Sequence, residues 1–149
     1  MKASTPAVPL EIVVVEDNAA LLAVTIDALE QTGHRLRGVG SAEEFFLLPD
    51  YTSIDVAVID LNLPGEDGLS LAKRFRAASP LAGIIMVTAR TTLHDRMVGY
   101  ETGADIYLPK PVQLGELVSA VNALGRRIGR VPVVADDGPS SLPADLPCA

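Results

Sequence analysis

Cysteine is almost absent from this chain, with Cys148 the only one among 149 residues. A disulfide framework and a metal site built from several thiolates are therefore excluded. No apolar stretch reaches the length of a membrane-spanning helix, and residues 1–9 lack the apolar segment of a secretory signal peptide. These absences favour a cytosolic protein that does not act in a membrane.

Basic residues are outnumbered as well. The chain carries 12 Lys and Arg against 19 Asp and Glu, which gives a net charge of -7. Because the phosphate backbone of nucleic acids selects basic surfaces, we expect this chain itself to bind no nucleic acid. Hydrophobic residues make up 48% of the 149 residues, which is enough for one folded domain with a substantial core.

Short apolar runs alternate with segments of helical periodicity. The runs predict five strands, at residues 10–15, 34–39, 54–60, 83–87 and 106–108. The other segments predict five helices, at residues 18–32, 41–48, 67–78, 92–102 and 112–128. This alternation indicates an α/β fold whose parallel strands are joined by right-handed crossovers. The strand order 2-1-3-4-5 fits, with the most apolar strand, 10–15, placed centrally.

The composition divides the chain into three parts. We expect an N-terminal tail at residues 1–9, one folded domain at 10–129 and a linker at 130–149. The last part holds four prolines and an acidic pair and shows neither helical nor strand periodicity. We therefore expect the chain to be part of a longer protein.

Reactive side chains gather at the ends of the predicted strands. Glu16 and Asp17 follow the first strand, Asp60 closes the third, Thr88 follows the fourth, and Lys110 comes just after the fifth. Because the carboxyl ends of parallel strands meet at one edge of the sheet, we expect these side chains to lie together. Acids, a hydroxyl and an amine in one place suit a phosphoryl group held by a divalent metal.

The three expected carboxylates repel one another. At an effective dielectric constant near 20, one like-charged pair about 4 Å apart costs about 4 kcal/mol. A hard divalent cation removes that cost, and oxygen ligands around a phosphate favour Mg²⁺. Asp60 then serves as metal ligand and as the nucleophile that forms an acyl phosphate. Lys110 supplies a compact cation on the opposite side, and the Thr88 hydroxyl donates to a phosphoryl oxygen.

Taken in order, these residues resemble the response-regulator receiver domains of two-component systems, a flavodoxin-like family that includes the chemotaxis regulator. The resemblance spans about residues 10–127. It is carried by Glu16-Asp17, Asp60, Leu63-Pro64-Gly65 with Gly68, Thr88-Ala89, Gly103-Ala104-Asp105, and Tyr107 with Lys110-Pro111. It implies a doubly wound sheet of five parallel strands and a protein that catalyses its own phosphotransfer and dephosphorylation, without being a turnover enzyme.

The resemblance assigns roles by position. Asp60 would be the phosphoacceptor, and Thr88 and Lys110 would bind phosphoryl oxygens. Asp17 would be the direct ligand of Mg²⁺, with Glu16 acting largely through water. The phosphodonor would be the phosphohistidine of a histidine kinase. A transcriptional output domain, of winged-helix type by analogy, would follow the linker.

Further positions also match. The backbone carbonyl of Asn62 would complete the metal ligands, and Asn62 and Arg90 would tune hydrolysis of the acyl phosphate. The peptide bond before Pro111 would be cis. Tyr107 would turn inward when Thr88 is drawn toward the phosphate, which would repack the surface of the fourth helix and fifth strand.

A second set of residues resembles the OmpR-type subfamily, whose receivers dimerise through the fourth helix, fifth strand and fifth helix. The set is Asp95-Arg96, Glu101, Gly103-Ala104-Asp105 and Arg126-Arg127. Ile106 stands where that pattern has Asp, and Ala120 where it has Arg. We therefore hypothesise a homodimer face with an apolar patch of Ile106, Ala120 and Val112. The alternative is that Ile106 packs under the fifth helix.

Other interpretations of the acids are open to test. A phosphatase with an Asp nucleophile would need a second acid two residues after Asp60, where Asn62 stands. A pseudo-receiver scaffold is disfavoured by the intact acids together with Thr88 and Lys110. Considered alone, the acids fit helix caps and turns, and Tyr107 fits a static aromatic at the rim. We expect His34 and His94 at the surface, without a role.

Overall fold

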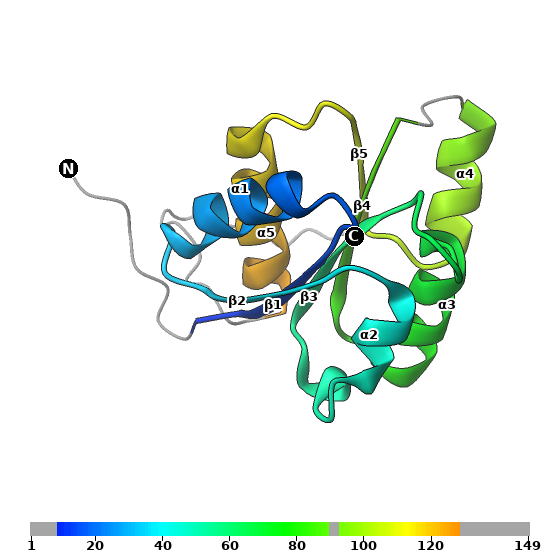
Figure 1. Ribbon diagram of the computed structural model, residues 1–149, viewed down its shortest axis with the longest axis horizontal. Helices are drawn as coiled ribbons and strands as arrows, with labels where there is room; N and C mark the ends of the chain where they lie inside the picture. The colour runs from blue at the N-terminus through cyan, green and yellow to red at the C-terminus, as the bar shows by residue number, and fades with distance from the viewer. Residues whose placement is uncertain (1–8, 90–92, 129–149) are drawn as a thin grey trace, which may run out of the picture.

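The computed structural model describes residues 9–89 and 93–128 (Figure 1). Arg90 and the expected linker lie outside these residues. The strands are β1 (Glu11–Val15), β2 (Arg35–Val39), β3 (Val56–Asp60), β4 (Gly83–Thr88) and β5 (Ile106–Pro109). The helices are α1 (Ala19–Glu30), α2 (Ala42–Leu47), α3 (Gly68–Ala78), α4 (Leu93–Glu101) and α5 (Leu114–Arg127), with a turn of 3-10 helix, η1 (Tyr51–Ser53). None of these helices has both the length and the apolar character that crossing a membrane requires.

The strands form one sheet in the order β2-β1-β3-β4-β5, and each neighbouring pair is parallel. The expected flavodoxin-like α/β fold and its strand order are thus confirmed. β1 is an interior strand, as its apolar run predicts, but β3 occupies the middle of the sheet. The connections reverse direction between β1 and β3, so the carboxyl ends of these two strands border the crevice where such folds bind ligands.

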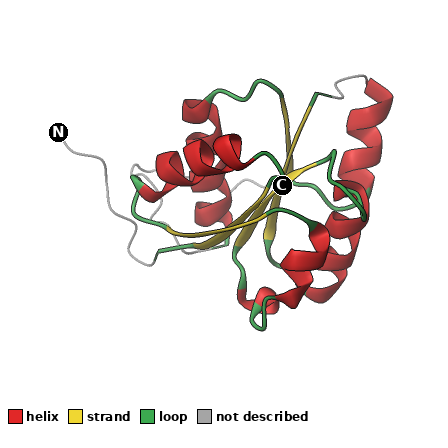
Figure 2. Ribbon diagram, viewed as in Figure 1, coloured by secondary structure: helices red, strands yellow, loops and turns green. Residues whose placement is uncertain are grey.

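Helices cover both faces of the sheet, with α1 and α5 on one face and α2, α3 and α4 on the other (Figure 1, Figure 2). On the α2/α3 face, the rings of Phe45 and Phe75 meet edge to face with centroids 5.2 Å apart. On the opposite face, Leu29 and Leu117 pack against the apolar side chains of the strands. Every residue of β3 and β4 is buried. Polar side chains at the ends of these strands are therefore held in surroundings with little solvent.

Side-chain caps explain where several helices begin. Asn18, Ser41 and Asp67 each accept a hydrogen bond from the backbone N–H three residues later, at 2.9, 3.1 and 2.9 Å. These residues are caps rather than first helical residues, so the helices start one residue later than expected. The carboxylate of Glu44 accepts the backbone N–H of Gly40 at 2.8 Å, just before α2.

His34 is not a surface residue as expected, because it is only 6% exposed. Its Nδ1 accepts the backbone N–H of Leu10 at 3.1 Å, and its Nε2 lies 3.4 Å from Oδ1 of Asn122 on α5. The imidazole therefore ties the start of β1 to α5. Burial lowers its pKa below the usual value, although the hydrogen bond with Asn122 and the charge of Asp55 act in the opposite direction.

Candidate functional site

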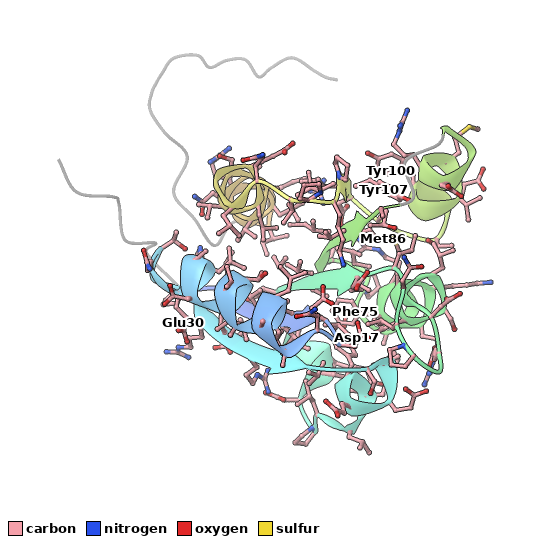
Figure 3. The ribbon with its side chains drawn as sticks, turned by 45° about the horizontal axis from the view of Figure 1, so that its top comes forward. Asp17, Glu30, Phe75, Met86, Tyr100 and Tyr107 are labelled. Carbon is pink, nitrogen blue, oxygen red and sulfur yellow. The ribbon has the colours of Figure 1, made fainter. Side chains whose placement is uncertain are left out.

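Three acidic side chains meet at the carboxyl ends of β1 and β3. Val15 and Ile59 are register partners in the sheet, so the residues that follow them emerge side by side. One carboxylate oxygen from each of Glu16, Asp17 and Asp60 lies within 4.8 Å of the others. Figure 3 shows Asp17 at this edge. The acidic cluster expected from the strand ends is thus present.

Two of the three acids are buried. Asp60 is 4% exposed and Glu16 is 6% exposed, whereas Asp17 is open to solvent. Burial raises the pKa of Glu16, and the nearby charge of Asp60 raises it further. A hydrogen bond from Asn18 N, 3.1 Å from Oε2 of Glu16, and the charge of Lys110 act in the opposite direction. The cluster therefore carries like-charge repulsion that a cation relieves.

Lys110 reaches into the cluster from the end of β5. Its Nζ donates to Oδ2 of Asp60 at 3.1 Å and to Oε1 of Glu16 at 3.3 Å. Burial works to lower the pKa of this amine, but the hydrogen bonds and charges of the two carboxylates raise it above its usual value. Lys110 is therefore a charged lysine that contacts both buried acids.

The loop between β3 and α3 fixes the other side of Asp60. Oδ1 of Asp60 accepts the backbone N–H of Asn62 at 3.0 Å. Gly68 N donates to Leu61 O at 3.0 Å, which closes the loop as α3 begins. Gly68 lies so close that a Cβ there would stand 2.5 Å from the carbonyl oxygen of Asp60. Glycine at this position lets α3 start directly against the acid-bearing strand.

Thr88 lies at the end of β4, beside β3, and is completely buried. Its carbonyl oxygen accepts the backbone N–H of Lys110 at 2.8 Å, so the ends of β4 and β5 are joined at the site. The peptide bond between Lys110 and Pro111 is cis, the geometry that the resemblance implied. The structure thus brings Thr88 and Lys110 to the edge that holds the acids.

Tyr107 lies on β5 and is 7% exposed, so its ring already points inward. Its centroid is 6.1 Å from that of Tyr100 on α4, which is 49% exposed (Figure 3). The turn of Tyr107 on activation stays a prediction.

The donor set fits a divalent cation. Three carboxylates offer hard oxygen ligands at one point, two of them buried and one raised in pKa by its surroundings. Carboxylate-rich oxygen sites of this kind suit Mg²⁺, which keeps several of its waters.

The prediction that Ala120 lies in an exposed apolar patch is wrong. Its side chain is 8% exposed and belongs to the core between α5 and the sheet. Ala120 follows Leu117 by three residues, so both lie on the buried face of α5. Ile106 and Val112 are half-buried and pack against the same core. Ile106 therefore packs under α5, as the alternative stated.

Sequence reasoning missed the partners of Asp105. Its Oδ2 accepts from Arg76 at 2.7 Å and its Oδ1 accepts from Arg127 at 2.6 Å. Arg76 also donates to the carbonyl oxygens of Gly103 and Ala82. The contacts of Asp105 with Arg76 and Arg127 join residues more than 20 positions apart in the chain, so no local pattern signals them.

Comparisons with known proteins agree with this geometry. The family model described as the response regulator receiver domain matches residues 12–122. The chain is 37% identical over 123 residues to the transcriptional regulatory protein TcrA of Mycobacterium tuberculosis, with 83% of this chain and 48% of that protein covered. It is 38% identical over 134 residues to the two-component response regulator PhoP of Pseudomonas aeruginosa, with 89% and 60% covered. The chain thus spans about half the length of the curated relatives it matches.

A solved structure gives the same result in three dimensions. The BeF3-activated receiver domain of DrrB, a protein of Thermotoga maritima, superposes with a TM-score of 0.75 at 27% identity. The match covers 80% of this chain and 99% of that one. On its sequence, its strand order and its acidic edge, this chain belongs to the family of response regulator receiver domains.

Proposed function

We propose that this chain accepts a phosphoryl group on Asp60 from the phosphohistidine of a histidine kinase. The observation that carries the proposal is the placement of Asp60 among two further acids and 3.1 Å from the ammonium group of Lys110. Receiver-family membership and the similarity to PhoP, a two-component response regulator, support the same conclusion. We place this receiver domain at residues 10–129, followed by a linker at 130–149.

In the proposed reaction a carboxylate oxygen of Asp60 attacks phosphorus while the bond from phosphorus to the imidazole nitrogen of the donor breaks. The imidazole leaves with the electron pair of that bond and takes up a proton. Lys110 and Thr88 bind phosphoryl oxygens and stabilise the charge that spreads over them. Hydrolysis of the acyl phosphate by water restores Asp60, so the chain undergoes its own chemistry without being a turnover enzyme.

Glu16, Asp17 and Asp60, with the backbone carbonyl of Asn62, are the residues that would hold Mg²⁺. When bound, Mg²⁺ would neutralise charge on the acids and on the phosphoryl oxygens, so that the Asp60 carboxylate and the phosphoryl group, which are both anionic, can approach each other. We propose that Asn62 and Arg90 tune the rate at which the acyl phosphate is hydrolysed.

The switch that we propose runs from Thr88 to Tyr107. A shift of the Thr88 side chain toward the phosphoryl group would stabilise the inward position of the Tyr107 ring and so change the surface of α4 and β5. The name of TcrA, a transcriptional regulatory protein, supports a role for that surface in controlling a transcriptional output domain.

We also propose that phosphorylation favours a homodimer through α4, β5 and α5. Ala120 is buried, but among the described side chains of α4 Met97 and Tyr100 are apolar and 52% and 49% exposed. Sedimentation of the activated protein tests this. Activated protein that stays monomeric at high micromolar concentration would contradict it.

Beryllium fluoride, a phosphoryl mimic, tests the central proposal. We expect Mg²⁺ to raise the thermal midpoint and beryllium fluoride to raise it further, because a ligand at ~100 times its dissociation constant stabilises by about 2.7 kcal/mol. Asp60→Asn should lose the beryllium fluoride response, and Asp27→Asn, on the exposed side of α1, should keep it. A retained response in Asp60→Asn would refute the assignment.

Acetyl phosphate gives a second and direct readout. Incubation with Mg²⁺ and acetyl phosphate should add the mass of one phosphoryl group to the wild-type chain and none to Asp60→Asn. An unchanged wild-type mass would favour the scaffold alternative.

A further inference from the structure

The loop from Leu61 to Asp67 carries Asn62, and its first part is held at the site. Asn62 N donates to Asp60, and Leu63 is buried at 9% exposure. The next residues, Pro64 and Gly65, are exposed and bury no side chain of their own. What holds this second part of the loop is a set of side chains on α2 and α3 outside the receiver motifs.

Glu43, on α2, contacts the backbone of the loop. Its Oε2 accepts the N–H of Glu66 at 3.2 Å. The same oxygen lies so near Gly65 that a Cβ there would stand 3.0 Å from it. Gly65 has φ +72°, in the left-handed region that favours glycine. The carboxylate of Glu43 therefore contacts the loop in a conformation that glycine at position 65 makes accessible.

Glu66 holds the loop from the other direction. Its Oε1 pairs with Nη1 of Arg74, and its Oε2 accepts the hydroxyl of Ser70 at 2.7 Å. The Glu66 side chain is 17% exposed, so this carboxylate is largely shielded. A carboxylate that forms an ion pair and also accepts a hydroxyl hydrogen bond is oriented more firmly than one that forms a single solvated pair.

Arg74 in turn rests on α2. Its guanidinium carbon lies 3.9 Å from the centroid of the Phe46 ring, within the range of a cation–π contact. Phe46 packs edge to face against Phe45 and Tyr51, with centroids 5.1 Å apart in each case. Arg74 thus links the loop to a packed aromatic cluster. We call Glu43, Phe46, Glu66 and Arg74 the loop clamp.

We propose that the loop clamp positions the loop for metal binding, so that Glu43, Glu66 and Arg74 are positioning residues that set the affinity for Mg²⁺. The inference rests on the proposed function in one respect, namely that the Asn62 carbonyl is a metal ligand. If the clamp is released, the second part of the loop samples other conformations, and the carbonyl is presented for only part of the time. The apparent affinity for Mg²⁺ then falls in proportion to the fraction of time for which the Asn62 carbonyl is presented.

Arg74→Ala distinguishes a positioning role from a purely electrostatic one, because the two predict opposite changes in the affinity for Mg²⁺. Removing a positive charge from the neighbourhood of an acidic site strengthens cation binding, because a Coulomb repulsion is removed. Loss of positioning weakens it. We expect Arg74→Ala to raise the Mg²⁺ dissociation constant about three- to tenfold in titration calorimetry of the full chain. Phe46→Leu changes no charge and should act in the same direction.

The matched control is Arg35→Ala. Arg35 forms an exposed ion pair with Glu11 at the amino ends of β1 and β2, the opposite edge of the sheet from the acids. Its side chain is 71% exposed, compared with 54% for Arg74. We expect its Mg²⁺ affinity to match that of the wild type. Arg74→Lys should rescue only part of the effect, since lysine lacks the planar fork.

Hydrogen exchange supplies a readout without metal. The amide of Glu66 should exchange faster in Arg74→Ala than in the wild type, whereas the amides of β3 should be unchanged. Unchanged or tighter Mg²⁺ binding by Arg74→Ala would overturn the inference, as would a lower thermal midpoint with an unchanged dissociation constant. A wild-type chain that neither binds Mg²⁺ nor takes up phosphoryl would instead refute the proposed function.

Discussion

The ammonium nitrogen of Lys110 lies 3.1 Å from Oδ2 of Asp60, and it contacts Glu16 as well. An internal cation thus balances part of the charge that a divalent ion would balance. In the proposed function the carboxylates of Glu16 and Asp60 therefore have two competing cations, the ammonium group of Lys110 and Mg²⁺ from solution. This competition makes the cluster sensitive to removal of the lysine.

Lys110→Met should destabilise the chain in buffer without divalent cations by about 1–3 kcal/mol, because it leaves two buried carboxylates without their cation. The lysine side chain is 27% exposed, which keeps the expected cost below that of a fully buried pair. Mg²⁺ should restore most of the loss and should bind the variant more tightly than the wild type. Urea unfolding with and without Mg²⁺ measures both effects. Equal stability of variant and wild type without Mg²⁺ would contradict the pairing.

Gly68→Ala should be strongly destabilising. A Cβ at this residue would stand 2.5 Å from the carbonyl oxygen of Asp60 and 2.7 Å from the Cα of Leu61. Both are backbone atoms, so no change of rotamer relieves the clash, and we expect a loss of about 2–4 kcal/mol. Gly115→Ala is the control, because a Cβ there meets nothing within 4 Å. In α5 it should stabilise by about 0.5–1 kcal/mol. Chemical denaturation that ranks the two variants in the reverse order would refute this geometry.

Arg76→Ala should cost about 2–4 kcal/mol, since it removes one of the two arginine partners of Asp105 and the guanidinium donor of several carbonyl groups in two loops. Arg76 pairs with Asp105 at 2.7 Å and donates to Gly103 O at 2.9 Å. Arg76→Lys should recover only part of the loss, because one ammonium cannot replace the planar fork. Arg35→Ala removes a solvent-exposed pair and should change the unfolding free energy by less than about 1 kcal/mol. Similar losses for Arg76→Ala and Arg35→Ala would contradict the anchoring role.

The acidic edge was predictable because it depends on local patterns and on one topological rule. Apolar runs locate the strands, and each acid lies at the end of its strand or just after it. Once the strand order is 2-1-3-4-5, the ends of β1 and β3 must adjoin, so Glu16 and Asp60 meet. The position of Lys110 follows in the same way from the end of β5. Helix starts were off by one residue where a capping side chain stands just outside the helix.

Contacts that depend on how helices pack were not predictable in this way. The cation–π contact between Arg74 and Phe46 joins α3 to α2 through side chains whose spacing carries no signal. Ala120 was assigned to the surface from a family pattern, whereas the rotation of α5 turns it inward with Leu117. His34 follows a helix-ending glycine and precedes an exposed strand, so its neighbours in sequence suggested solvent. Its burial comes from Leu10 and Asn122, which are distant in the chain.

The buried His34 should make stability depend on pH. Because burial lowers its folded-state pKa, the unfolded chain takes up a proton near pH ~6.5 while the folded chain stays neutral. Unfolding is then favoured as the pH falls below that value, so this contribution to stability is complete above pH ~7 and is lost on acidification. Protonation of Nδ1 would also remove the acceptor that Leu10 N uses at 3.1 Å.

His34→Gln isolates this contribution. Glu16, whose pKa is raised by burial, acts with the opposite sign, because it favours unfolding as the pH rises through about 4.5. That effect is common to variant and wild type, so it cancels in their difference. We expect the stability advantage of the wild type over His34→Gln, measured by urea unfolding, to shrink between about pH 7.5 and about pH 5.5. An advantage that stays constant over this interval would mean that His34 is protonated as readily in the folded chain as in the unfolded one.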